Sequence, residues 1–183
     1  MATATQTATG VTTWKIDPAH SVAQFAVKHM MIATVRGRFG EISGEIHLNE
    51  SNFQDSTADI VVNTSSVDTR ESQRDAHLRS ADFFDVETFP TMTFHVTRVE
   101  GPIEEFKLAG DLTIHGVTHP VTFDVTHEGR GRDPWGGERI GFAVTGKIKR
   151  SDFGLNWNAA LETGGFLVGD EVKITFDVEA LKA

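Results

Sequence analysis

The sequence predicts an all-β protein with one short helix, folded as an antiparallel β-barrel of about eight strands. Three observations predict this fold: apolar and polar residues alternate along several long segments, a single segment has the pattern of a helix start, and helices do not alternate with strands as a parallel sheet would require. A barrel of about eight strands has room inside for one slender ligand.

The clearest pair of strands lies in the middle of the chain. Residues 106–114 carry an apolar side chain or glycine at every second position, and residues 117–125 largely repeat the pattern. His115 and Gly116 lie between the two segments, and glycine accepts the positive φ that a tight reversal demands. We therefore expect these segments to form a hairpin.

Other segments show the same alternation, and one of them changes phase. Near the start of the chain, Phe25 and Val27 share a face, but the apolar phase flips near Gly40 before the pattern resumes at Ile42. Such a flip predicts a β-bulge or a sharp bend, which lets a strand curve around a closed barrel. The remaining strands are expected around residues 58–62, 92–96, 140–149 and 172–178.

The helix is expected within residues 68–79. Asp68 is the predicted N-cap, because Glu71 follows three residues later as in a capping box. Phe83 and Phe84 come soon after the helix, and Pro90 ends the segment. This segment is expected to cover a mouth of the barrel.

Length and composition limit the class of protein. The 183 residues fit one domain, with a flexible segment expected at residues 1–12 and the barrel at residues 13–183. The net charge of −9 argues against nucleic-acid binding, and no apolar stretch is long enough for a transmembrane helix. The first residues lack the basic and apolar runs of a signal peptide, so the expected location is the cytoplasm, or an exported compartment if a signal has been removed.

Motifs for catalysis and metal binding are missing from the sequence. The chain has no cysteine, and its eight histidines form no cluster at metal-ligand spacing. It also lacks a Gly-x-Ser-x-Gly elbow and a phosphate loop. We therefore expect no catalytic residues, no metal and no cofactor other than a bound lipid.

Four stretches of the sequence carry a family resemblance that runs from Trp14 to Leu181. The chain resembles the YceI family of polyisoprenoid-binding proteins, and this resemblance implies a lipocalin-like barrel whose apolar tunnel holds an extended isoprenoid chain. The stretches are Trp14-Lys-Ile-Asp-Pro-Ala-His-Ser21 with Phe25-Ala-Val-Lys-His29, His77-Leu-Arg-Ser-Ala-Asp-Phe-Phe-Asp85 with Phe89-Pro90, Gly110-Asp-Leu-Thr-Ile-His-Gly-Val-Thr-His-Pro-Val121, and Arg150-Ser-Asp-Phe-Gly-Leu155.

The aromatic composition suits an interior that holds hydrocarbon. Thirteen phenylalanines and no tyrosine leave the interior rings without phenolic hydroxyl groups that need partners. Each ring has the alternative role of filling the core, since small barrels are normally filled by side chains. The expected lipid contacts are Phe25, Val27, Phe39, Phe84, Phe94, Phe123, Phe142 and Phe153. Phe84 and Phe153 lie in the family-like stretches, and their alternative role is to close an end of the barrel.

A polar headgroup would need a few contacts at one end of the tunnel. The candidates are His20, His29, Arg36 and His119, whose alternative role is ordinary solvation at the rim. His29 and His119 share the apolar phase of their strands and are the better candidates for an inward position.

The leading hypothesis is the binding, storage or transport of a long apolar lipid, a polyisoprenoid or isoprenoid quinone. One alternative is an enzyme that acts on an isoprenoid or quinone-like substrate with a histidine acid or base. Another is a purely structural or protein-interaction barrel, which predicts a contiguous exposed apolar patch. An exposed strand edge would also allow a homodimer.

Overall fold

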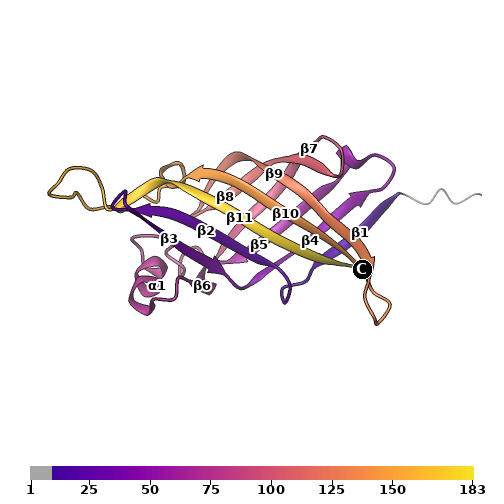
Figure 1. The fold of residues 1–183 in the computed structure, drawn as a ribbon, viewed down its shortest axis with the longest axis horizontal. Helices are drawn as coiled ribbons and strands as arrows, with labels where there is room; N and C mark the ends of the chain where they lie inside the picture. The colour runs from indigo at the N-terminus through magenta and orange to yellow at the C-terminus, as the bar shows by residue number, and fades with distance from the viewer. Residues whose placement is uncertain (1–9) are drawn as a thin grey trace, which may run out of the picture.

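The protein is a closed antiparallel β-barrel with one α-helix at its side (Figure 1). The structure is a computed structural model that describes residues 10–183, so most of the segment expected to be flexible, residues 1–9, lies outside the described residues. The strands are β1 (Val11–Ile16), β2 (Val22–His29), β3 (Ala33–Phe39), β4 (Ile42–Asn49), β5 (Thr57–Asn63), β6 (Val67–Asp68), β7 (Thr91–Glu100), β8 (Glu105–Ile114), β9 (Val117–Arg132), β10 (Glu138–Lys149) and β11 (Val168–Lys182).

The barrel closes because the last strand pairs with both halves of a broken first strand. The first half of β11 pairs with β2, and its end pairs with β1 through Trp14 and Lys182. β1 and β2 act as one strand interrupted at residues 17–21, and they pair with β4 and β3, which are interrupted at residues 40–41. The eight-stranded antiparallel barrel and the bend predicted at Gly40 are confirmed.

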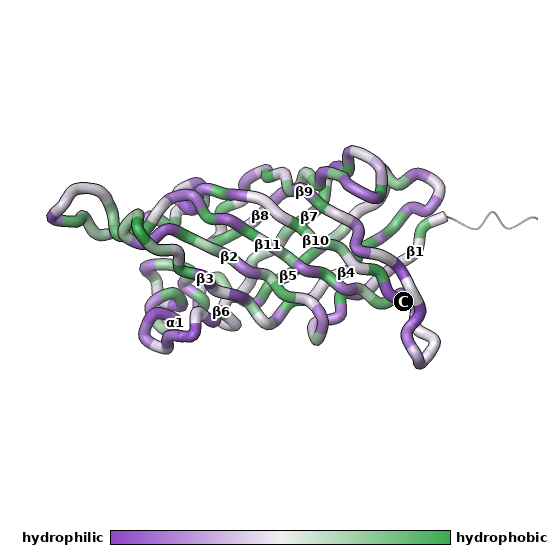
Figure 2. Tube along the Cα trace, viewed as in Figure 1, coloured by the Kyte–Doolittle hydropathy of each residue, from purple (hydrophilic) through white to green (hydrophobic). Residues whose placement is uncertain are grey.

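The central hairpin follows the sequence pattern. β8 and β9 pair from Glu105 opposite Thr126 to Ile114 opposite Val117. His115 and Gly116 form the turn with φ of 53° and 72°, which confirms the predicted reversal. Along the strands, hydrophobic and hydrophilic residues alternate (Figure 2).

The single α-helix, α1 (Ser72–Arg79), lies beside β3 and β6 at one end of the barrel (Figure 1). Its predicted N-cap was wrong. Glu71 is the N-cap and accepts hydrogen bonds from the backbone N–H groups of Gln73 and Arg74, whereas Asp68 accepts one from the N–H of Arg70 in the preceding turn. Within residues 10–183, no helix is both long and apolar enough to cross a membrane.

Residues 10–183 also contain three short 3-10 helices: η1 (Phe53–Asp55), η2 (Thr64–Ser66) and η3 (Arg150–Phe153). The main core fills the end of the barrel that holds the C-terminus, around the fully buried Trp14. A second cluster packs Phe153 and Leu155 against β8 and β9 at the other end. The buried core is therefore divided into two clusters made of different residues.

Candidate functional site

A long cavity of about 400 Å³ runs inside the barrel, and most of the side chains that line it are apolar. Its volume lies within the range of pockets that bind small molecules. The middle of the cavity is lined by inward-facing residues of seven strands, namely Phe25, Val35, Ile60, Phe94, Phe123, Val144 and Ile174.

Three glycines in the wall keep the phenylalanine rings away from the barrel axis. A Cβ atom on Gly37 would lie 2.3 Å from the Phe25 ring, and one on Gly146 would lie 2.3 Å from the Phe123 ring. Gly110 has the same relation to Phe94, at 2.7 Å. Because these rings lie against bare backbone, they occupy the wall and leave the centre of the barrel open.

The end of the barrel near the C-terminus is closed by packed aromatic residues. The ring centroids of Phe53 and Phe106 are 4.8 Å apart, and those of Phe106 and Phe142 are 6.0 Å apart. Beyond them, Trp14 is completely buried, and its indole Nε1 donates to Thr12 Oγ1 at 2.9 Å. We call this the closed end.

At the opposite end, the cavity reaches the surface between α1, the β2–β3 turn and the β10–β11 connection. There the lining residues His29, His77, Trp157 and Leu167 are only half-buried. We call this end the mouth, and residues 154–169 the mouth segment.

An aromatic cluster joins α1 to the mouth segment. The His77 ring centroid lies 4.7 Å from that of Trp157 and 5.1 Å from that of Phe83. His77 Nε2 lies 2.8 Å from Asp82 Oδ2, so this carboxylate orients the imidazole. The cluster closes one side of the mouth and gives it a polar group that faces the cavity.

The buried side chain of Arg150 holds the mouth segment in place. Its guanidinium donates hydrogen bonds to the carbonyl oxygens of Leu155, Trp157, Val168 and Gly169, at 2.6 to 3.2 Å. Burial lowers the pKa of this guanidinium, but an arginine stays protonated at neutral pH. Arg150 thus acts as a clasp between the end of β10 and the start of β11.

Seven of the eight predicted lipid contacts line the cavity: Phe25, Val27, Phe39, Phe84, Phe94, Phe123 and Phe142. Phe153 does not line it. This ring is 1% exposed and packs against His119, at 5.6 Å between centroids, so it plugs the space beneath β9. Phe153 was selected because it lies in a family-like stretch, and this stretch forms the 3-10 helix η3 rather than a strand of the wall.

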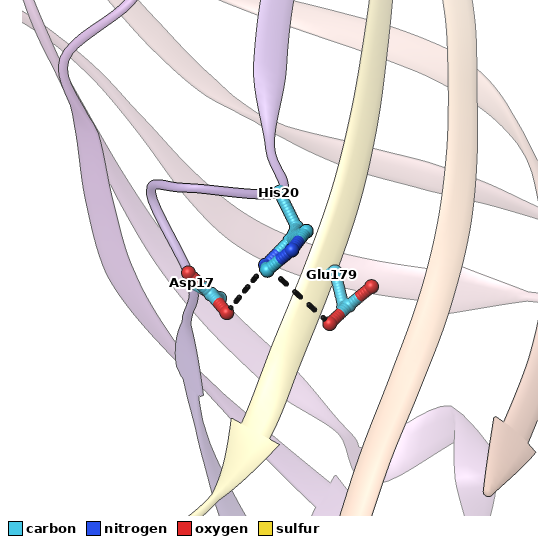
Figure 3. A group of neighbouring side chains, drawn as sticks. All are labelled: Asp17, His20 and Glu179. Atoms are coloured by element: carbon cyan, nitrogen blue, oxygen red, sulfur yellow. Dashed lines mark hydrogen bonds and ion pairs between the residues drawn. The ribbon is translucent and has the colours of Figure 1, made fainter. Parts of the chain in front are cut away.

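The four predicted headgroup residues lie at separate places. His29 lines the cavity at the mouth. Arg36 is exposed on the outer face of β3, and His119 packs on Phe153 outside the cavity lining. His20 lies in the turn between β1 and β2, beside Asp17 and Glu179 (Figure 3).

The group of Asp17, His20 and Glu179 has ligand atoms within 4.8 Å of one another, as a metal site would. However, Arg139 Nη1 already donates to Asp17 Oδ2 at 2.7 Å and to Glu179 Oε1 at 2.6 Å. The hydrogen bond from Arg139, followed by that with His20, lowers the pKa of Asp17 to about 2. The group is therefore an ion-pair network in which a guanidinium neutralises the carboxylates.

Four residues of the mouth are absent from the predicted site residues: Arg74, His77, Arg150 and Trp157. His77 and Arg150 begin two of the family-like stretches, which was the available signal. Arg74 donates to the carbonyl oxygen of Thr69 at 2.9 Å and lines the cavity. Nothing in the local pattern of the helix indicated that it faces the barrel.

Comparison with known proteins places the chain in a family. The model described as a YceI-like domain matches residues 14–180. A UPF0312 protein of Staphylococcus epidermidis is 41% identical over 172 residues, which cover 92% of this chain and 97% of that protein.

Solved structures show the same fold. BcnA of Burkholderia cenocepacia is 25% identical, with a TM-score of 0.78 over 90% of this chain and 98% of its own. A polyisoprenoid binding domain from Saccharophagus degradans is 19% identical, with a TM-score of 0.68 over 93% and 98%. By its family model and its sequence relatives, the chain belongs to the YceI-like family.

Proposed function

We propose that this protein binds one long apolar lipid, a polyisoprenoid or an isoprenoid quinone, lengthwise inside the barrel, and thereby stores or carries it. The observation that supports this proposal is the continuous apolar cavity, which the wall glycines keep open. The name of the Saccharophagus degradans domain agrees with a ligand of this class.

The length of the cavity favours a chain longer than an ordinary acyl chain. On β11 its lining runs from Val168 to Val178, which are ten residue steps apart. At about 3.3 Å per residue and a strand tilt of about 40°, this is about 25 Å along the barrel axis. An acyl chain of a bilayer lipid spans about 15 Å, half of the hydrocarbon core.

Burial of the chain supplies the affinity. Each CH₂ group removed from water contributes about 0.8 kcal/mol, and part of the sum is offset by ordering of the chain. The wall needs few polar groups for this purpose. The half-buried His29 and His77 at the mouth would contact the polar end of the lipid.

The test is native mass spectrometry of protein purified without detergent, followed by organic extraction of any bound lipid. We expect a lipid adduct in the wild type and its loss in Ile174→Trp, because Ile174 lines the middle of the cavity. Lys173→Trp is the matched control, since Lys173 is exposed on the outer face of the same strand. A wild-type protein that is reproducibly free of lipid, or equal lipid content in both variants, would contradict the proposal.

A second candidate function is acid–base chemistry on the bound lipid. The observation that favours it is the His77–Asp82 pair, because a carboxylate that orients a cavity-lining histidine is a common arrangement for proton transfer. The test is to incubate the protein with an isoprenoid quinone. Turnover that is lost in His77→Ala, while lipid stays bound, would support an enzyme.

A further inference from the structure

The rim of the mouth carries two exposed apolar tips. In the β2–β3 turn, Met30, Met31 and Ile32 are 40%, 66% and 81% exposed, and Phe166 in the mouth segment is 62% exposed. Among residues 10–183 these are four of the six large hydrophobic side chains with high exposure. The turn stands out as hydrophobic in Figure 2, at the end of the molecule that also carries the mouth segment (Figure 1).

The two tips lie side by side and continue directly into the cavity wall. The backbone N–H of Met30 donates to the carbonyl oxygen of Leu167 at 2.8 Å. His29, the residue before the first tip, lines the cavity, and so does Leu167, the residue after Phe166. A lipid that enters or leaves at the mouth therefore passes this rim.

In the β2–β3 turn, two methionines adopt a backbone conformation that other residue types adopt more readily. Met30 and Met31 have φ of 51° and 61°, in the left-handed region that glycine and asparagine adopt most readily. Two exposed methionines there cost conformational energy and gain no burial in the monomer. This cost is understandable if the turn has a binding partner that takes up apolar side chains.

We propose that this rim docks on the surface of a phospholipid bilayer, with Met31, Ile32 and Phe166 inserted at the boundary between headgroups and acyl chains. The proposal rests on the proposed function, because its purpose is to let the lipid move between membrane and barrel without crossing water. Docking would point the mouth at the membrane.

The hydrogen bonding of the tips suits an apolar environment. In the β2–β3 turn, the backbone N–H of Ile32 donates to the carbonyl oxygen of His29, and that of Met30 donates to the carbonyl oxygen of Leu167. In the mouth segment, Ala160 and Phe166 form a β-bridge, and Leu167 N–H donates to the carbonyl oxygen of Ala159 at 2.9 Å. Backbone groups already bonded within the protein can enter the interface at lower cost than free ones.

A bilayer fits the tips better than a protein partner or a second copy of the chain. A stable protein interface buries about 800 Å² on each partner, far more than four side chains on two turns provide. Insertion into a bilayer instead requires only a few apolar residues that protrude together.

The charge of the chain points to neutral headgroups. The net charge is −9, and Glu162 is the only charged residue between Asp152 and Asp170. Attraction to an anionic surface is therefore not the driving force for docking. The driving force is instead the insertion of apolar side chains into a zwitterionic surface. The carboxylate of Glu162 would lie near the headgroups and weaken binding to anionic lipids.

The test is co-sedimentation of the full chain with phosphatidylcholine vesicles. We expect partitioning of the wild type to fall at least about ten-fold in Met31→Asn/Ile32→Ser/Phe166→Ser, because three apolar side chains are lost from the interface. Asparagine is chosen at position 31 because it tolerates the left-handed backbone. Val11→Ser/Trp135→Ser is the matched control, since these two exposed residues lie away from the mouth and should leave partitioning unchanged.

Two results would overturn the docking proposal: a wild type that does not partition, or a triple variant that partitions like the wild type although its thermal unfolding is unchanged. A wild-type dimer that dissociates in the triple variant would also overturn it, in favour of a second copy as the partner.

Glu162→Lys should raise partitioning on vesicles that contain phosphatidylglycerol and change it little on phosphatidylcholine. No difference between the two vesicle types would count against the proposal.

Lipid content, measured on the same samples by mass spectrometry, separates this proposal from the proposed function. Triple-variant protein that keeps its lipid but no longer sediments supports docking at the rim. Wild-type protein that sediments but never contains lipid contradicts the proposed function, and with it the stated purpose of docking.

Discussion

At the closed end of the barrel, cations pair with carboxylates, whereas at the mouth the buried cation Arg150 donates its hydrogen bonds to backbone carbonyl groups. At the closed end, Arg139 forms ion pairs with three carboxylates, which belong to the β1–β2 turn, the β9–β10 turn and β11. The guanidinium of Arg130 lies over the Trp14 ring, 4.7 Å from its centroid. At the mouth, the long β10–β11 connection is held instead by hydrogen bonds to its backbone, four from Arg150 and two with the side chain of Asn158. This difference teaches that the closed end is held by charge pairs between side chains, whereas the mouth segment is held by hydrogen bonds to its backbone.

The largest expected effect comes from breaking the closed end. Trp14→Ala removes a completely buried indole, and we expect a loss of about 3–5 kcal/mol in the free energy of unfolding. Urea denaturation measures this loss. Trp135→Ala is the control, because Trp135 is 86% exposed and its removal should change stability by no more than about 0.5 kcal/mol. Similar losses in both variants would show that the closed end is not the stabilising part of the barrel.

Substitution of Arg150 tests the mouth, the other end in this comparison. Arg150→Met keeps an apolar stem but leaves four carbonyl groups of the mouth segment without their donor, so we expect a loss of about 2–3 kcal/mol. Hydrogen exchange should become faster in the mouth segment and stay unchanged in β1. Lys149→Met, on the exposed outer face, should alter neither measurement. Equal acceleration at both ends would mean that Arg150 stabilises the whole barrel rather than its mouth.

Much of the barrel could be predicted from the sequence, because alternation is a local property. Most of the strands, the turn at His115 and the bend at Gly40 follow from residues close together in the chain, although β1 and β6 were not predicted. Arg139 and Asp17 could not be paired in this way, since 122 positions separate them and only the closure of β1 on β11 brings them together.

The candidate site was predicted only in outline for the same physical reason. Period two shows that Phe123 faces inward, but not that its ring lies against Gly146, and it says nothing of Phe153, which lies in the 3-10 helix η3. The contact of Phe123 with Gly146 depends on which residue stands opposite in a neighbouring strand, which the sequence alone does not reveal.

Substitution of a wall glycine should have a smaller effect on stability and should also reduce the amount of bound lipid. Gly146→Ala places a methyl group against the Phe123 ring and should push it toward the barrel axis, at a cost of about 1–2 kcal/mol and with less bound lipid. Adding Phe123→Leu should restore the lipid content. Gly131→Ala is the control, because a Cβ atom there meets no other atom within 4 Å. Full lipid content in Gly146→Ala would show that the glycine does not keep the cavity open.

The smallest effect concerns the ion pair that joins the broken strand to the barrel. Arg139 holds the pKa of Asp17 at about 2, below its usual value of 3.8, so the folded state favours the ionised carboxylate. Its contribution to stability is complete above about pH 4 and is lost as the pH falls toward 2. Because Asp17 is partly exposed and water screens the pair, we expect Asp17→Asn to lose only about 1 kcal/mol at pH 7.

Urea denaturation at pH 7, 4 and 2.5 measures this pH dependence. The difference in unfolding free energy between the wild type and Asp17→Asn should shrink as the pH falls below about 4, because Asp17 then gains a proton in the unfolded chain while the folded state still holds it ionised beside Arg139. Glu171→Gln, at an exposed position near the mouth, provides a control for general charge effects. A difference that stays constant down to pH 2.5 would mean that Asp17 acts through hydrogen bonds that an amide cannot replace, and not through its charge.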